Sequence, residues 1–457
     1  MLGEFMSGKR TILIGTFILT ATGLLTRFIG FFFRMFLSHT FGEEQVGLYQ
    51  LIFPIYALCF SLTSAGIETA LSRCTAHKIS LGRKNEAIQL LYIGIGISLI
   101  LSFATMVILQ SHATDFSIYI LGDIRCEPML LAISYAIPFA SVHSCICGYY
   151  LGLKQTKIPA ISQLIEQLVR VGTVFIIYQT AMKHKVNTNI LFAVLGIVAG
   201  ECFSSLFCFH CFRTGTKKIS HNNSFLNTKM AHKFSISNTK ALCRELLQLA
   251  IPLTSSRILL NILQSVESIS IPLRLQQYGY TTSAALSNFG VLTGMALPCV
   301  LFPTAVTNSI STMLLPTVAE IQATEHYSKL REVVYKVFIS CLSLGLFCCF
   351  IFLLLGNFMG NVLFHSELAG NYLQTLAWIC PFLYLNSTLI SITNGLGKAN
   401  VSFIINTLGL AIRIIGVLVF IPRIGMNGYL WGLLLSQFVT FVLCLLHLSS
   451  YLKKRTL

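Results

Sequence analysis

The chain has 457 residues, of which 54% are hydrophobic and 11% are charged, whereas about 25% of residues are charged in a typical soluble domain. This composition excludes a water-soluble globular fold. The net charge of +16 would suit nucleic acid, but no segment outside the apolar stretches combines basic residues with stacking aromatic side chains, so we expect no nucleic-acid partner.

Windows of about 20 apolar residues, long enough to cross a hydrocarbon core of about 30 Å as a helix, recur along the chain. They predict an all-α integral membrane protein with about twelve transmembrane helices. The first six spans lie near residues 11–36, 46–71, 87–110, 128–151, 159–181 and 190–212. The second six lie near residues 246–272, 284–317, 333–355, 372–394, 400–422 and 428–450.

The second half of the chain repeats the first at a constant offset of 243 residues. Because each copy holds an even number of spans, both copies enter the membrane with the same orientation, and the repeat is parallel. We expect two six-helix lobes, residues 1–212 and 242–457, with a linker at 213–241. The matching positions are Pro138 and Pro381, Gly152 and Gly395, Arg170 and Arg413, and Ile67, Thr69, Leu71 and Ala76 with Ile310, Thr312, Leu314 and Ala319.

The distribution of basic residues predicts the orientation in the membrane. With both termini in the cytoplasm, most of the 32 Lys and Arg residues fall on the cytoplasmic side, as the positive-inside rule requires. The Lys-, Ser- and Asn-containing segment 213–241 is interpreted as a cytoplasmic linker. No small-residue cleavage site follows the first apolar run, so this run is interpreted as a retained span of a multi-pass protein of the cell membrane.

Fifteen cysteines are spread mostly through the predicted spans. Cys208, His210 and Cys211 form a tight cluster near the cytoplasmic end of the sixth span. The cluster lacks the second Cys or His pair that a structural zinc site uses. These residues, like Cys145 and Cys147, are interpreted as small core residues, and no metal or cofactor is expected.

Charged side chains inside the spans are the main functional candidates. An Arg near the centre of a membrane helix costs about 2.5–3.5 kcal/mol on insertion scales, so such residues should face protein or a water-filled cavity. The charged residues in the spans are Arg27, Arg34, Glu68, Glu166, Arg170, Glu201, Arg257, Glu267 and Arg413.

Four of these residues are interpreted as a structural ion-pair group. Glu166 lies four residues before Arg170, which places the two on one helix face in the favourable order. Such a pair can neutralise itself and pack against Glu201. Arg413 recurs at the position of Arg170 in the second copy.

The other five are interpreted as a substrate site. Arg27 and Arg257 come from repeat-equivalent spans, and two guanidinium groups facing one cavity suit a phosphate or diphosphate. Arg34 is either a further ligand or a side chain that snorkels to the membrane surface. Glu68 and Glu267 either balance the arginine charge or exchange a proton or Na⁺ during transport.

Several segments carry a resemblance to a known family. They read GLKQTKIPAISQ at 152–163, GMALP at 294–298, FPT at 302–304 and LLPTVAE at 314–320. The sequence TRFIG at 26–30 is similar to the arginine motif of lipid II flippases. Over nearly its whole length the chain resembles the stage V sporulation protein B family, within the multidrug/oligosaccharidyl-lipid/polysaccharide flippase superfamily that also contains the MATE transporters.

The resemblance implies two six-helix lobes and a central cavity lined by the first, second, seventh and eighth spans, where Arg27, Glu68, Arg257 and Glu267 would meet. It also implies translocation of an undecaprenyl-diphosphate-linked sugar, such as lipid II for the spore cortex, with membrane lipid as a partner. A cation-coupled multidrug antiporter and a non-transporting scaffold for cortex assembly are the alternatives. An enzyme is not expected, because Asp115, Asp123 and Glu127 are too few and too isolated for a catalytic site.

Overall fold

The computed structural model describes residues 2–185, 189–222, 236–323 and 327–456, which are almost entirely helical and contain no β-strand. Within these ranges nine helices are long and apolar enough to cross a membrane, or up to eleven if each of two bent helix pairs counts as one span. The predicted class, an all-α multi-pass membrane protein, is confirmed. The predicted number of twelve spans is not confirmed.

Large apolar side chains cover much of the helix surface. On α14 (Tyr327–Phe364), Phe347, Phe350, Leu354 and Phe358 are each more than 60% exposed and follow one another at helical spacing. Cys348 and Phe352 of the same helix are buried. One face of α14 is therefore suited to contact with lipid tails, while the other packs inside the protein.

The described residues form two compact units. Unit 1 consists of Met1–Gly30 and Leu51–Ser265, and unit 2 consists of Phe31–Gln50 and Val266–Leu457. These units differ from the lobes expected from the sequence, because α1 (Leu2–Leu51) and α10 (Ile236–Tyr278) each contribute to both units. The backbone of α1 is broken at Gly42, where φ is 80°. At 1.5 Å per residue, α10 and the part of α1 before this break are each longer than a hydrocarbon core is thick, so each is long enough to contribute to two helix bundles.

The linker expected at 213–241 is helical at both ends. Residues 213–222 continue α9 (Leu191–Asn222), and residues 236–241 begin α10. The residues between them, 223–235, lie outside the described residues.

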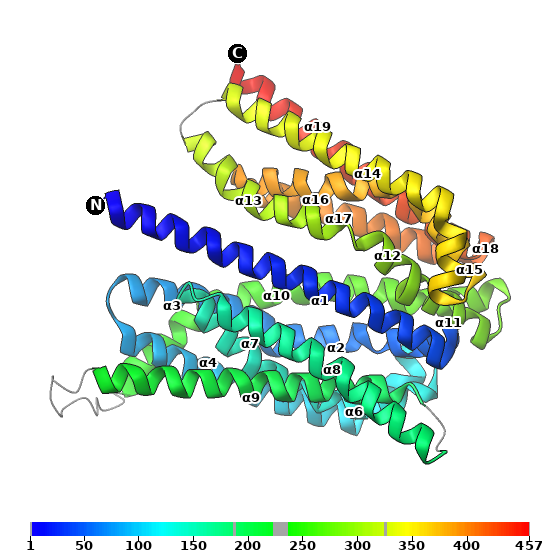
Figure 1. The fold of residues 1–457 in the computed structure, drawn as a ribbon, viewed down its shortest axis with the longest axis horizontal. Helices are drawn as coiled ribbons and strands as arrows, with labels where there is room; N and C mark the ends of the chain where they lie inside the picture. Colours follow the sequence, from blue (N-terminus) through cyan, green and yellow to red (C-terminus); the bar gives the residue numbers. More distant parts are fainter. Residues whose placement is uncertain (1, 186–188, 223–235, 324–326, 457) are drawn as a thin grey trace. The chain divides into compact units, whose positions relative to one another are not determined.

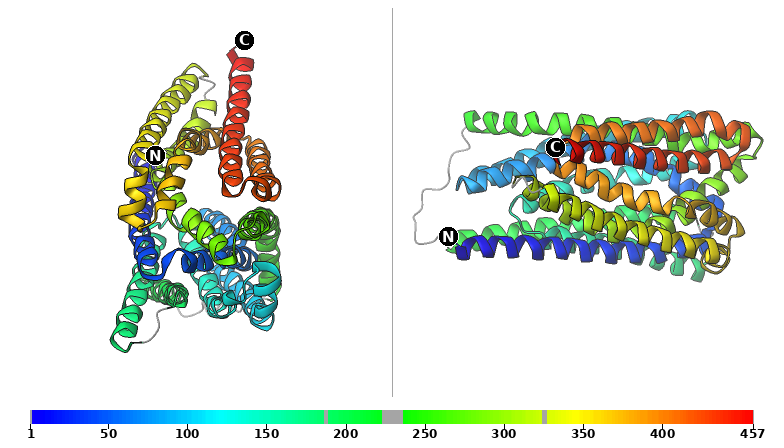
Figure 2. Two further views of the ribbon diagram at one scale, coloured as in Figure 1. Left: turned by 90° about the vertical axis from the view of Figure 1, so that its right-hand side faces the viewer. Right: turned by 90° about the horizontal axis from the view of Figure 1, so that it is seen from above.

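In unit 1, α3 and α4 pack on α7, and α8 packs along α9. Figure 2, left, shows most helices of this unit nearly end-on, as a bundle of roughly parallel helices. Leu71, Leu91, Ile146 and Cys208 lie in the shared core. The elements that complete unit 1 are α2 (Phe53–Phe60), η1 (Ser61–Ala65), α3 (Gly66–Ser80), α4 (Lys84–Ser111), α5 (Ala113–Asp115), η2 (Phe116–Leu121), η3 (Ile124–Cys126), α6 (Glu127–Ser134), α7 (Ala136–Gly152) and α8 (Lys157–Lys183).

In unit 2, α13 and α14 pack on α16, and α17 packs along α19 (Figure 1). The core contains Leu314, Leu330, Leu389, Ile392 and Cys444. Besides α14, the elements of unit 2 are α11 (Thr282–Gly290), η4 (Val291–Ala296), α12 (Leu297–Leu301), α13 (Thr304–Ala323), α15 (Glu367–Ala377), α16 (Cys380–Gly395), α17 (Ala399–Ile415), η5 (Gly416–Phe420), α18 (Ile421–Ile424) and α19 (Met426–Thr456).

The sequence repeat is present in the backbone. The ends of α3 and α13, the starts of α4 and α14, and the ends of α7 and α16 each differ by the offset found in the sequence. The pair α6 and α7 is bent by 43°, and its counterpart α15 and α16 is bent by 56°. Pro138 and Pro381 follow these bends at matching positions, as expected for residues that cannot donate a backbone N–H to the helix.

The turn after α7 recurs after α16. Lys154 has φ 60°, and the equivalent Gly397 has φ 71°. In both copies the same three backbone hydrogen bonds close the turn, with N–H donors at 153–155 and 396–398. Glycine adopts this left-handed conformation without a Cβ clash, so the second copy makes the turn with less strain than the first.

Candidate functional site

Arg257 lies near the middle of α10, in the part of this helix that belongs to unit 1. Its Nη2 donates a hydrogen bond of 3.0 Å to Oγ1 of Thr69 on α3. Among the described residues no carboxylate oxygen lies within 4.0 Å of the guanidinium, and the side chain is exposed. Because a guanidinium carries five N–H donors, most of its hydrogen-bonding capacity is left for a ligand.

Glu68 precedes Thr69 on α3 and is partly buried. Its Oε2 accepts a hydrogen bond of 2.9 Å from Oγ of Ser144 on α7. Arg257 is close enough to interact electrostatically with this carboxylate without forming a direct ion pair. We call Glu68, Thr69, Ser144 and Arg257 the α3–α10 polar site. It places a guanidinium group beside a carboxyl group within the apolar helices.

Two glycines bring the neighbouring helices close to this site. A Cβ on Gly148 of α7 would lie 2.5 Å from the backbone oxygen of Glu68, and a Cβ on Gly66 of α3 would lie 2.8 Å from the backbone nitrogen of Thr254 on α10. Small residues allow such close helix contacts inside membranes. α7 and α10 can therefore both reach α3 where Glu68 and Thr69 lie.

Gly148→Ala should destabilise the protein, because the added methyl group would push α7 away from α3. Overpacking of this kind costs about 1–3 kcal/mol, and the thermal unfolding temperature of the purified protein in detergent should fall. Gly172→Ala is the matched control, since a Cβ there meets nothing within 4 Å and alanine favours helix by about 1 kcal/mol. Equal unfolding temperatures for the two variants would contradict the close α3–α7 contact.

A buried ion pair occupies unit 2. Nη2 of Arg413 lies 3.0 Å from Oε2 of Glu267, and the Tyr429 hydroxyl donates a 2.9 Å hydrogen bond to Oε1. Glu267 is only 5% exposed. The sequence assigned Glu267 to the substrate site and Arg413 to a structural group with Glu166, Arg170 and Glu201. The structure instead pairs Glu267 and Arg413 with each other.

A second ionisable cluster lies among α2, α7, α8 and α9 of unit 1. Arg170 forms an ion pair with Glu166 on α8. On α9, the buried Glu201 accepts a hydrogen bond of 3.2 Å from the Tyr56 hydroxyl, and its Oε2 lies 3.3 Å from Nδ1 of His143. The repeat thus keeps an arginine in both copies but changes the helix that supplies its carboxylate, from α8 in unit 1 to α10 in unit 2.

The two arginines of the first span belong to different units. Arg27 lies exposed on the part of α1 in unit 1, together with Arg257. Arg34 is partly buried in unit 2 and interacts electrostatically with Cys299 of α12. The sequence expected Arg27 and Arg257 to come from opposite lobes. The structure groups them in one unit because α10 belongs to unit 1 up to Ser265, and Arg257 on this part of the helix contacts Thr69 of α3.

The sequence interpretation missed His143, which contacts Glu201, and Ser144, which contacts Glu68. His143 lies inside the predicted fourth span, and a histidine at membrane depth is as much a functional signal as an arginine. Including histidine among the charged candidates would have found it. Ser144 carries no comparable signal, because serine is common in membrane helices.

The family model described as polysaccharide biosynthesis protein matches residues 12–322. Stage V sporulation protein B of Bacillus subtilis (strain 168) is 29% identical over 92% of this chain and 80% of that protein. Lipid II flippase MurJ of the same organism is 21% identical over 90% of this chain and 77% of that protein.

Solved structures share the fold. An inward-facing multidrug resistance MATE family transporter of the MOP superfamily has a TM-score of 0.67 at 14% identity, with 95% of each chain covered. Lipid II flippase MurJ in an inward closed conformation has a TM-score of 0.68 at 14% identity, covering 95% of this chain and 87% of that one.

The apolar helices, the fold and these matches support a membrane flippase or transporter of the MOP superfamily as the class of protein, and not an enzyme. The chain belongs to the polysaccharide biosynthesis protein family. The sequence resemblance to stage V sporulation protein B is confirmed. A multi-pass membrane location is confirmed as well, whereas the cytoplasmic placement of both termini stays a prediction.

Proposed function

We propose that this protein is a flippase that translocates an undecaprenyl-diphosphate-linked saccharide, such as lipid II, by alternating access. Its family and its similarity to stage V sporulation protein B and to a lipid II flippase support this substrate class. Duplicated membrane bundles commonly transport by alternating access. Membrane lipid surrounds the protein and accommodates the polyprenyl tail.

The main support for the proposal is that the guanidinium of Arg257 is exposed and contacts a neutral hydroxyl group. Arg170 and Arg413 each contact a carboxylate, so their charges are neutralised locally. Arg257 donates to the neutral Thr69 hydroxyl and is exposed. A charge at membrane depth is expensive unless it is compensated, and the guanidinium fork matches the oxygens of a phosphate group. An anionic headgroup would provide that compensation.

The proposal gives the remaining candidates distinct roles. Arg27, in the same unit, supplies a second guanidinium to the diphosphate. Glu68 either balances Arg257 when no lipid is bound or exchanges a proton or Na⁺ during the cycle. Arg34 stays a candidate contact of the substrate at the edge of its binding site. We assign Glu267 a structural role with Arg413, because its carboxylate is buried and both of its oxygens are engaged.

Mass spectrometry of lipids that remain bound to the purified protein tests this function. We expect polyprenyl-diphosphate saccharides to be enriched relative to bulk phospholipids when the protein comes from cells that synthesise them. Bound phospholipid alone, combined with proton- or Na⁺-driven efflux of a cationic dye, would instead support the antiporter. Bound polyprenyl lipid without flipping in liposomes would support the scaffold. Either result would contradict the proposal.

A further inference from the structure

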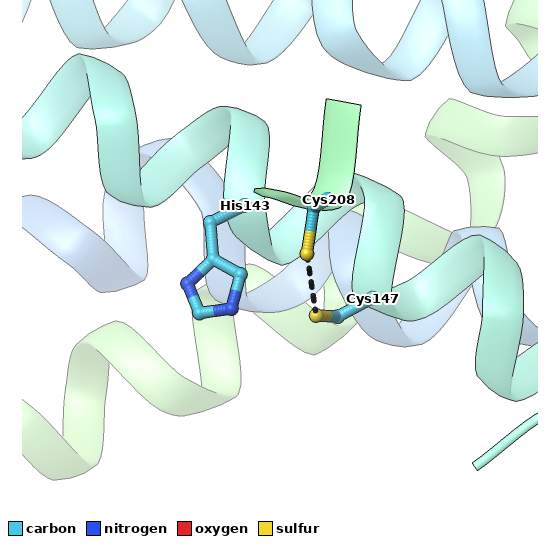
Figure 3. A group of neighbouring side chains, drawn as sticks. All are labelled: His143, Cys147 and Cys208. Atoms are coloured by element: carbon cyan, nitrogen blue, oxygen red, sulfur yellow. Dashed lines mark hydrogen bonds between the residues drawn. The ribbon is translucent and has the colours of Figure 1, made fainter. Parts of the chain in front are cut away.

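Three metal-ligating side chains converge in unit 1, away from the α3–α10 polar site. His143 and Cys147 lie four residues apart on α7 and therefore on one helix face. Cys208 reaches them from α9. A nitrogen of His143 and the two sulfur atoms all lie within 4.8 Å of one another. The imidazole ring lies beside both sulfur atoms (Figure 3).

The separation of the two sulfurs has the value expected for a metal site. Sγ of Cys147 lies 3.9 Å from Sγ of Cys208. In a tetrahedral zinc site with Zn–S bonds of about 2.3 Å, two thiolate sulfurs lie about 3.8 Å apart. A disulfide would need about 2.05 Å. The two helices thus hold the thiols at the spacing of ligands that share one ion.

Neighbouring groups orient the histidine for coordination. Nδ1 of His143 lies 3.3 Å from Oε2 of Glu201. In the tautomer with its proton on Nδ1, the ring donates to that carboxylate and Nε2 keeps a lone pair for a metal. Nε2 lies 3.0 Å from Oγ of Ser162, and that oxygen is 3.5 Å from Sγ of Cys147. A carboxylate that fixes the tautomer of a ligating histidine is a usual feature of zinc sites.

The surroundings favour a soft or borderline cation over Mg²⁺ or Ca²⁺. Cys147 and Cys208 are 7% and 0% exposed, and thiolate and imidazole ligands suit Zn²⁺ and Cu⁺, whereas Mg²⁺ and Ca²⁺ prefer oxygen. Two thiolates cancel the charge of a divalent ion, which lowers the cost of burial. The predicted cytoplasmic location of both termini would place the cluster in the cytoplasmic half of the membrane, where thiols stay reduced.

We propose that His143, Cys147 and Cys208 bind one Zn²⁺ ion, with the Ser162 hydroxyl or a water molecule in the fourth position. The ion ties α7 to α9. Because α7 also carries Ser144, which holds Glu68, the ion restrains one wall of the α3–α10 polar site. Cys208 thus pairs with residues on another helix rather than with its neighbours His210 and Cys211.

Zinc retention by the full-length protein in detergent tests the proposal. After incubation with Zn²⁺ and removal of loosely held metal with a weak chelator, we expect about one zinc per chain in the wild type. We expect none in the Cys147→Ser, Cys208→Ser double variant. Cys145→Ser is the matched control, because Cys145 is buried on the same helix but donates to Ser98 instead, and it should retain the full amount.

X-ray absorption of the zinc-loaded protein provides the structural readout. It should show two sulfur neighbours at about 2.3 Å and a nitrogen neighbour at about 2.0–2.1 Å. His143→Gln should lose zinc while keeping both thiols. This variant tests the zinc site even if the double cysteine variant does not fold. Zinc retention no higher than in the double variant, an equal loss in Cys145→Ser, or a Cys147–Cys208 disulfide would each overturn the site.

Discussion

Replacing Arg27 and Arg257 together with alanine should abolish flipping of a fluorescent undecaprenyl-diphosphate saccharide in liposomes, while membrane insertion stays normal. Hydrogen bonds to charged groups are worth about 1.5–3 kcal/mol each. The loss of one such bond already weakens binding roughly 10- to 100-fold, and the loss of two arginines removes the positive charge proposed to hold the diphosphate. The measurement is the fraction of inner-leaflet label that becomes accessible at the outer surface of the liposomes over time.

Two single variants sharpen this experiment. Arg257→Lys keeps the charge but not the forked donors, so it should retain only part of the activity. Arg274→Ala is the control on the same helix, because Arg274 lies far beyond Arg257 along α10 and donates to Gln277 near the end of the helix. Wild-type flipping by the double alanine variant would refute the assignment of these arginines to the diphosphate.

The second large effect concerns the buried ion pair of unit 2. Arg413→Ala should destabilise the protein by about 3–5 kcal/mol, because it leaves the Glu267 carboxylate buried without its partner. The side chain of Glu267 is 6% exposed and that of Arg413 is 24% exposed, so solvent screens the pair only weakly. The measurement is the free energy of unfolding in mixed detergent and denaturant.

The stability lost in Arg413→Ala should come from the unpaired charge of Glu267 and not only from lost packing. Glu267→Gln combined with Arg413→Gln removes both charges and should recover most of the stability. Lys336→Ala is the control for an exposed pair, since Lys336 and Glu332 are 72% and 62% exposed, and such pairs contribute little. If the double variant is as unstable as Arg413→Ala, the ion pair is not the cause.

The sequence predicted much of the architecture because the repeat constrains it locally. Pro138 and Pro381 follow the bent helix pairs, and Gly152 and Gly395 end α7 and α16. These effects depend on the missing N–H of proline and on the turns that end helices. They act within a few residues, so a single sequence reveals them.

The pairing of distant charges depends on tertiary packing, which sequence patterns do not reveal. Arg413 contacts Glu267 and not a counterpart of Glu166, because α10 brings a carboxylate to α17 where α8 supplies its own in the first copy. Helix spacing predicts contacts three or four residues apart. It does not predict which face of one span meets another.

The same limit explains the metal-ligand cluster. Along the chain, Cys208 is closest to His210 and Cys211, and that local pattern lacks the spacing of a zinc site. Its partners in the fold are His143 and Cys147, on another helix. Only the packing of α7 against α9 brings the three ligands together.

The most direct test of the central claim is the amount of polyprenyl-diphosphate saccharide retained by purified wild-type protein and by Arg257→Ala, measured by quantitative mass spectrometry. We predict a roughly 10- to 100-fold lower retention in the variant, from the loss of charge-assisted hydrogen bonds, with phospholipid retention unchanged. Equal retention of the polyprenyl lipid by both proteins would show that Arg257 does not hold the headgroup.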